Sequence, residues 1–100
     1  MKIENQGSRL LVSELTELNA TNAAEFRDQS RAMLTSQTTV AEVDLSATRF
    51  LDSSGLGALI ALHKTMVGRG GNVRILNPTP AAQQVLELTR LHRILEIVKI

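Results

Sequence analysis

The amino-acid sequence predicts an α/β fold in which one mixed, mostly parallel β-sheet of about five strands packs against helices. The first observation is size and composition: 100 residues, 43% hydrophobic and 21% charged, suit one globular domain with one core. The second is an opening pair of strand-like segments joined by a turn. The third is the alternation of helix-like and strand-like segments that follows. Together they give the order ββαβαβαβ over residues 1–100, a single domain with parallel neighbouring strands.

The strand segments are runs of apolar and β-branched residues bounded by turn-forming residues. The predicted strands span residues 1–6, 9–14, 40–45, 72–76 and 94–100. Gln6-Gly7-Ser8 has the composition of a hairpin turn and joins the first two strands. Isoleucine and valine dominate the last segment, which therefore favours a strand over a helix.

Three helices are predicted from apolar residues that recur at three- and four-residue spacing. The predicted helices span residues 22–36, the segment from the Asp52–Gly55 turn to about Val67, and a segment that begins at Pro80. Asn22 and Thr79 are expected to cap the first and third helices. The residues expected on the apolar side of the second helix are Leu56, Leu59, Ile60, His63 and Val67.

Composition excludes several classes of function. The net charge is +1, and basic residues neither form a run nor alternate with aromatic residues, which argues against nucleic acid as a partner. The absence of cysteine excludes disulfides and thiolate metal sites, and no metal or other cofactor is expected. The longest uncharged apolar stretch, residues 56–62, is too short for membrane insertion. The N-terminus lacks the apolar region of a signal peptide, so a cytoplasmic protein is expected.

The most unusual local sequence is Phe50-Leu51-Asp52-Ser53-Ser54-Gly55-Leu56-Gly57, which follows a strand that ends in Asp-Leu-Ser. Functional sites of open α/β sheets lie beyond the carboxyl ends of the strands. Ser53 or Ser54 is expected at or beside the helix N-cap, where a hydroxyl oxygen can accept hydrogen bonds from free amides. The two glycines leave the first turn bare, so that another group can approach closely. Taken alone, the four residues Asp-Ser-Ser-Gly also fit a simple helix start.

The whole stretch resembles the signature of STAS domains, especially bacterial anti-sigma-factor antagonists. In that family, a strand ending in Asp-Leu-Ser leads through a Phe-x-Asp-Ser-Ser-Gly turn into a helix. The resemblance covers about residues 1–98 and continues through Gly71, Val73, Ile75, Pro80, Leu86, Leu91 and Ile94. It implies a STAS fold, and it implies that a partner kinase phosphorylates Ser53, the first serine after the aspartate.

The function that this resemblance implies is a non-catalytic switch in bacterial signal transduction and transcription regulation. The unphosphorylated chain would sequester an anti-sigma factor that is also a serine kinase. Phosphorylation of Ser53 would release this partner, and a PP2C-type phosphatase would restore the serine. The partner-binding residues that the resemblance implies are Asn19, Thr21, Asp52, Ser53, Ser54, Gly55, Leu56 and Gly57.

One departure from the family pattern affects this surface. The family often has Gly-Glu-Leu-Asp after its second strand, whereas this chain has Thr16-Glu17-Leu18-Asn19, with an amide in place of the last carboxylate. If that acid helps to present the serine to the kinase, phosphorylation of this chain would be slower or absent.

Other functions have less support in the sequence. Neither serine has the Gly-x-Ser-x-Gly frame of a nucleophile elbow. His63 lies about two turns along the helix, too far to activate Ser54, and His92 is interpreted as a surface residue. An enzyme is therefore not expected. STAS domains also serve as subunits of lipid-transport complexes, stressosome-like assemblies and anion transporters, and some are proposed to hold a nucleotide near the serine turn. A non-switching structural role and a nucleotide pocket stay open as alternatives.

Overall fold

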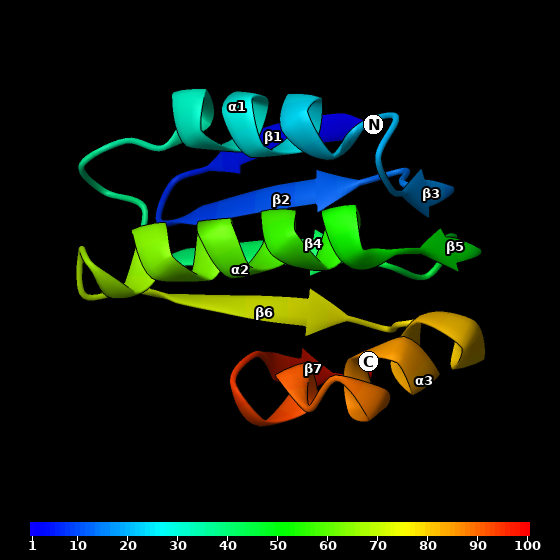
Figure 1. The fold of residues 1–100 in the computed structure, drawn as a ribbon. Helices are drawn as coiled ribbons and strands as arrows, with labels where there is room; N and C mark the ends of the chain where they lie inside the picture. Colours follow the sequence, from blue (N-terminus) through cyan, green and yellow to red (C-terminus); the bar gives the residue numbers. More distant parts are fainter.

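A five-stranded β-sheet forms the centre of the computed structural model, which describes residues 1–100 (Figure 1). Its strands, in spatial order, are β1 (Lys2–Gln6), β2 (Arg9–Ser13), β4 (Val40–Asp44), β6 (Asn72–Leu76) and β7 (Glu96–Val98). β1 and β2 form an antiparallel hairpin around Gly7, whose φ of 73° suits glycine. All other neighbouring strands are parallel. The predicted mixed, mostly parallel sheet is confirmed.

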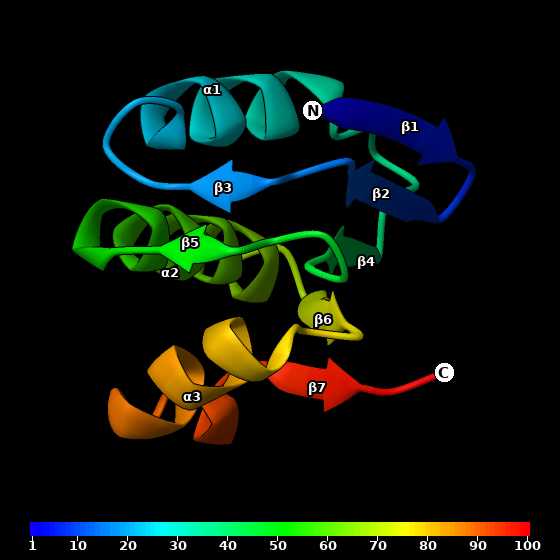
Figure 2. The ribbon, with the colours of Figure 1, turned by 90° about the vertical axis from the view of Figure 1, so that its right-hand side faces the viewer.

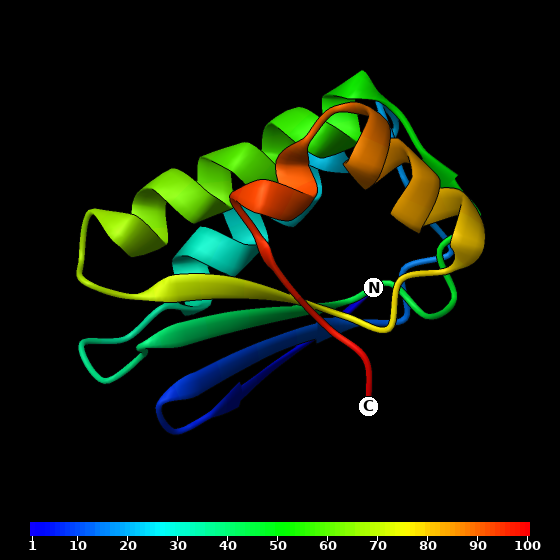
Figure 3. The ribbon, with the colours of Figure 1, turned by 90° about the horizontal axis from the view of Figure 1, so that it is seen from below.

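Three α-helices cover one face of this sheet (Figure 3). They are α1 (Ala23–Met33), α2 (Ser53–Val67) and α3 (Pro80–Leu88), and a short 3₁₀ helix, η1 (Leu91–Arg93), follows α3. No helix combines the length and the apolar character needed to cross a lipid bilayer. All the predicted elements are present, but two are shorter than predicted by more than one residue. The first helix ends at Met33, because Leu34 has extended backbone angles, and the last strand begins only at Glu96.

The two predicted helix caps had opposite outcomes. Thr79 caps α3, since its hydroxyl oxygen accepts a hydrogen bond from the Ala82 amide at 3.2 Å, and Pro80 takes the first helical position. Asn22 precedes α1 but makes no side-chain capping bond. Its Oδ1 instead accepts a hydrogen bond from the Asn19 amide at 3.0 Å, so this side chain closes the preceding loop.

Apolar side chains of the strands and helices fill the space between the two layers. In the middle of the sheet, Val12, Val43 and Ile75 are register neighbours and are fully buried. Phe26 of α1 and Leu59 of α2 are fully buried as well. Each such burial contributes about 1.5–3 kcal/mol relative to exposure. This apolar row therefore fixes which face of each strand points towards the helices.

The α2 helix buries a different face from the one predicted. Its buried residues are Gly55, Ala58, Leu59, Leu62 and Met66, so that only Leu59 is shared with the prediction. The other predicted positions are half-buried, except Val67, which is 53% exposed. α2 packs against both α1 and the sheet and is apolar on most sides, so the helical repeat alone does not show which side lies deepest.

The opposite face of the sheet carries no helix (Figure 3), and charged side chains line it. Glu42 Oε1 in β4 lies 3.2 Å from Arg9 Nε in β2, and Glu42 Oε2 lies 3.8 Å from Arg74 Nη1 in β6. Arg74 Nε in turn lies 3.3 Å from Glu96 Oε2 in β7. The parallel register places Glu42, Arg74 and Glu96 in one row. The long arginine side chains cover Glu42, which is only 5% exposed. These ion pairs keep the open face of the sheet hydrophilic.

Two short strands that the sequence analysis did not predict lie beyond the carboxyl ends of the main strands. β3 (Glu17–Leu18) and β5 (Phe50–Leu51) pair in parallel, with Leu18 opposite Leu51. Figure 2 shows β3 and β5 next to each other. Each strand has only two residues, too few for an alternating pattern to appear in a sequence. Their pairing brings together the segments that follow them, which contain Asn19 and Ser53.

Candidate functional site

Ser53 is the first residue of α2, and its side chain is exposed. The N-cap residue is Asp52, whose Oδ1 accepts a hydrogen bond from the Gly55 amide at 3.0 Å. The expected position of Ser53 beside the cap is found, but the expectation that a serine oxygen caps the helix is wrong. Ser53 and Ser54 are both exposed, and their hydroxyls make no hydrogen bond within the protein.

The second carboxylate oxygen of Asp52 joins this turn to a distant part of the chain. Asp52 Oδ2 accepts a hydrogen bond from the Ala20 amide at 3.2 Å. The Asp52 amide lies 3.4 Å from the Leu18 carbonyl oxygen and donates to it. Because β3 and β5 run parallel, the chain leaves both strands in the same direction. The loop after β3 and the turn before α2 therefore lie against each other.

Asn19 organises the loop after β3. Its Oδ1 accepts hydrogen bonds from the Thr21 amide at 3.0 Å and the Thr21 hydroxyl at 2.5 Å. Its Nδ2 donates to Glu17 Oε2 at 3.0 Å. Asn19 is half-buried, and the loop presents Ala20 and Thr21 to solvent instead. A carboxylate at position 19 would lie within hydrogen-bond distance of the Glu17 carboxylate, so the amide suits this particular loop.

The two glycines at the start of α2 lie in different surroundings. A Cβ at Gly55 would lie 2.0 Å from the Leu18 carbonyl oxygen, so Gly55 is needed for the close contact between α2 and β3. A Cβ at Gly57 would meet no atom within 4 Å. Gly57 instead lines a shallow cleft of about 430 Å³ between the starts of α1 and α2. The cleft is lined by Ala20, Ala23, Ala24, Arg27, Ser54, Gly57 and Ala58.

The predicted partner-binding residues all lie in this loop and turn, but they are not equally accessible. Five of them are exposed: Thr21, Asp52, Ser53, Ser54 and Gly57. These five residues and the exposed Ala20 are called the docking surface below. Asn19 and Leu56 are half-buried, and Gly55 is buried. These last three residues therefore shape the docking surface more than they present themselves to a partner.

Phe50 is a residue that the sequence analysis did not place at the site. It lies in β5, three positions before Ser53, and it is 64% exposed. It lines a cavity of about 610 Å³ whose other lining residues are Thr16, Glu17, Ser46, Ala47, Arg49 and Thr79. The available signal was the scarcity of aromatic residues, since the chain has only two. The other aromatic residue, Phe26, is fully buried.

The charges around Ser53 are few. Asp52 supplies the nearest carboxylate, and the first turn of α2 contains no acidic residue. Arg27 lines the same cleft as Ser54, and its Nε lies 3.4 Å from Asp28 Oδ1 on the same helix. A phosphate on Ser53 would therefore meet the positive end of the α2 dipole and the negative charge of Asp52.

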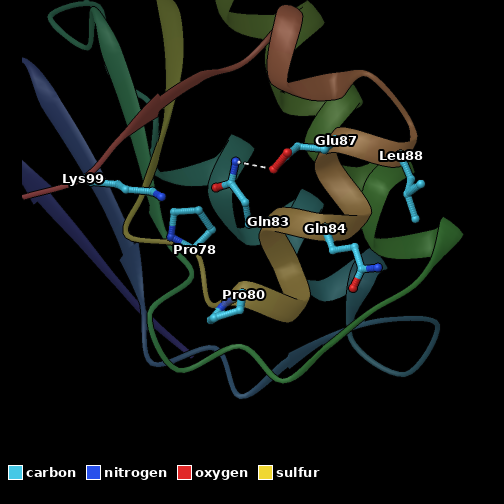
Figure 4. A pocket seen from close by; sticks show the side chains of 7 residues that line it. All are labelled: Pro78, Pro80, Gln83, Gln84, Glu87, Leu88 and Lys99. Carbon is cyan, nitrogen blue, oxygen red and sulfur yellow. Dashed lines mark hydrogen bonds between the residues drawn. The ribbon is translucent and has the colours of Figure 1, made fainter.

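The remaining candidates for a functional group are two histidines and one further cavity. No cluster of three or more His, Asp or Glu residues could hold a metal ion. His63 is half-buried on α2, with an Nδ1 that has no hydrogen-bond partner, and His92 is exposed. A cavity of about 540 Å³ lies beside α3 (Figure 4). Its lining includes Gln83, which donates to Glu87 at 3.2 Å, and none of the predicted site residues.

Solved structures of known proteins share this fold. The anti-sigma factor antagonist SpoIIAA in its unphosphorylated form matches with a TM-score of 0.86 and 18% identity, over 99% of this chain and 86% of that chain. Bacillus SpoIIAA in its phosphorylated form matches with a TM-score of 0.73 and 19% identity, over 99% of this chain and 89% of that chain. The Thermotoga maritima protein TM1081 matches with a TM-score of 0.86 and 24% identity, over 99% of this chain and 85% of that chain.

The same fold also occurs within a much larger protein. The murine anion transporter Slc26a9 matches with a TM-score of 0.77 and 19% identity, over 94% of this chain but only 16% of the transporter. At these identities the structural matches show a shared fold. A family model described as "Mlab, STAS domain" matches residues 1–98, nearly the whole length. The chain therefore belongs to the STAS domain family.

Proposed function

We propose that this STAS domain is a cytoplasmic, non-catalytic binding switch of the anti-sigma-factor antagonist type. In its unphosphorylated form it binds an anti-sigma factor that is also a serine kinase. Phosphorylation of Ser53 releases that partner, and a PP2C-type phosphatase resets the switch. The observation that carries this proposal is the exposed, unbonded hydroxyl of Ser53 at the first position of α2, inside the docking surface. SpoIIAA, which shares the fold, is known in both unphosphorylated and phosphorylated forms.

Phosphorylation of Ser53 is expected to change the free energy of binding more than the free energy of folding. Phosphorylation adds about −1.5 to −2 charges. At the start of a helix the dipole favours such an anion by about 0.3–1 kcal/mol, so the fold tolerates it. In a complex, the partner would bury the dianion and Asp52 together, and uncompensated like charges in an interface can cost several kcal/mol. A loss of about 3 kcal/mol corresponds to roughly a hundredfold weaker binding, enough to release a complex.

Substitutions at Ser53 test the proposal. Ser53→Asp is expected to abolish partner binding, because the bound partner would bury an additional uncompensated carboxylate beside Asp52. Ser53→Ala is expected to bind like the wild type. Both variants should keep the wild-type far-UV circular dichroism and melting temperature. The measurement is a quantitative pull-down from host-cell lysate. Normal binding by Ser53→Asp together with lost binding by Ser53→Ala would exclude charge as the signal.

A second candidate is a non-switching subunit of a lipid-transport or other multiprotein complex. It is favoured by the family description "Mlab, STAS domain" and by the match to one part of an anion transporter. For this role, wild type, Ser53→Asp and Ser53→Ala should capture the same partner equally well. That partner would be a transporter ATPase or permease subunit instead of an ATP-binding anti-sigma kinase.

A further inference from the structure

Asp52 is the one residue whose side chain hydrogen-bonds to both segments of the docking surface. One carboxylate oxygen accepts from Gly55 in the first turn of α2 at 3.0 Å, and the other accepts from Ala20 in the loop after β3 at 3.2 Å. These two hydrogen bonds are called the Asp52 bridge below. Asp52 is itself exposed, so solvent surrounds the rest of its side chain.

The loop depends on this bridge for one of its amides. Three of its four amides find partners within the loop: Asn19 donates to the Asn22 side chain, Thr21 to the Asn19 side chain, and Asn22 to the Asn19 carbonyl. Only the Ala20 amide donates to a group elsewhere in the chain, the Asp52 carboxylate. The Asp52 side chain therefore connects this loop by a hydrogen bond to the turn that carries Ser53.

We propose that Asp52 is a positioning residue: its main role is to hold the loop and the Ser53 turn in one arrangement, and this positioning outweighs any contact of its carboxylate with the partner. The expected effect on phosphorylation of Ser53 rests on the proposed function. A kinase that recognises both segments needs them fixed relative to each other. The bridge itself is a property of the free protein and can be tested without a partner.

The substitution Asp52→Asn distinguishes the effects of the two hydrogen bonds of the bridge. Asparagine caps helices about as well as aspartate, because its single carbonyl oxygen can still accept from Gly55. Its amide nitrogen would then face the Ala20 N–H, donor against donor, and the hydrogen bond to the loop would be lost. Alanine removes both hydrogen bonds. Asp28→Asn is the matched control, because it neutralises an exposed carboxylate on α1 outside the docking surface.

Amide hydrogen exchange followed by NMR tests the bridge in the free protein. In Asp52→Asn, exchange at Ala20 should accelerate by about tenfold or more, the effect of losing a hydrogen bond to a charged group. Exchange at Gly55 should stay near the wild-type rate. In Asp52→Ala both amides should exchange faster, and in Asp28→Asn neither should change. Wild-type exchange at Ala20 in Asp52→Asn would overturn the inference.

The fraction of Ser53 phosphorylated in host cells, measured by peptide mapping, tests the functional consequence. Asp52→Asn should lower this fraction as strongly as Asp52→Ala, although it keeps the helix cap, and Asp28→Asn should leave it unchanged. A lowered fraction without faster exchange at Ala20 would mean that the carboxylate contacts the kinase directly, which would also overturn the inference. If Ala20 exchanges faster in Asp52→Asn but wild-type Ser53 never carries phosphate, the bridge stands and the proposed function fails.

Discussion

Gly55 and Gly57 lie two positions apart at the start of α2, but the space around them differs. Gly55 is buried against the Leu18 carbonyl oxygen, and any side chain there would collide with backbone. Gly57 is exposed and faces an open cleft, so the fold does not require glycine at this position. Glycine inside a helix costs about 0.5–1 kcal/mol relative to alanine. Gly57, which the fold does not require, lines the same cleft as Ser54. A glycine at this position is consistent with a surface that a partner approaches closely.

Alanine substitutions at these two glycines should therefore have opposite effects on stability. Gly57→Ala should raise the free energy of unfolding by about 0.5–1 kcal/mol and weaken partner binding. Gly55→Ala should lower the free energy of unfolding by about 1–3 kcal/mol or more, because β3 or α2 must shift. Urea denaturation and the pull-down assay measure the two effects. Unchanged partner binding by Gly57→Ala would show that the cleft is not part of the interface.

At the scale of elements, α2 is where the predicted packing and the observed packing differ most. The predicted apolar side and the buried side share only Leu59. Leu62 is 3% exposed, whereas Val67, which was predicted to face the core, is 53% exposed. The cause is the position of α2, which packs against α1 as well as against the sheet.

The two sides of α2 should differ strongly in their contribution to stability. Leu62→Ala should lower the free energy of unfolding by about 2–5 kcal/mol, because it leaves a cavity in the core. Val67→Ala should change it by less than about 0.5 kcal/mol, as expected of an exposed position. Chemical denaturation of both variants measures the difference. Equal losses, or a larger loss for Val67→Ala, would contradict the observed orientation of α2.

What could be predicted from the sequence follows from how local each signal is. Adjacent residues are enough to predict three features that the structure has. These are the longer strands such as β4, the Thr79 cap, and the position of Ser53 beside a helix start. The β3–β5 pair, the Asp52 bridge and the exposure of Phe50 were missed. The β3–β5 pair and the Asp52 bridge join segments about thirty residues apart, and a single sequence does not show which segments meet.

At the scale of the whole molecule, the parts of the fold have separate roles. One face of the sheet packs against the helices (Figure 3), and the other is covered by ion pairs around Glu42. The docking surface lies beyond the carboxyl ends of the strands, where the β3–β5 pair joins the loop at Asn19 to the start of α2. Ser53 is exposed and makes no contact on which the core depends. For the proposed function, a phosphate there is expected to change binding and leave the fold intact.

The most direct test compares unmodified protein with protein that carries phosphoserine at position 53 or, as a matched control, at the exposed Ser36 in the loop after α1, outside the docking surface. Calorimetry gives the affinity for the captured partner, and thermal unfolding gives the stability. Phosphoserine at position 53 should weaken binding by about a hundredfold or more, with a melting temperature close to that of the unmodified protein. Phosphoserine at position 36 should leave the affinity unchanged. Equal affinities of the unmodified and Ser53-phosphorylated proteins would contradict the switch.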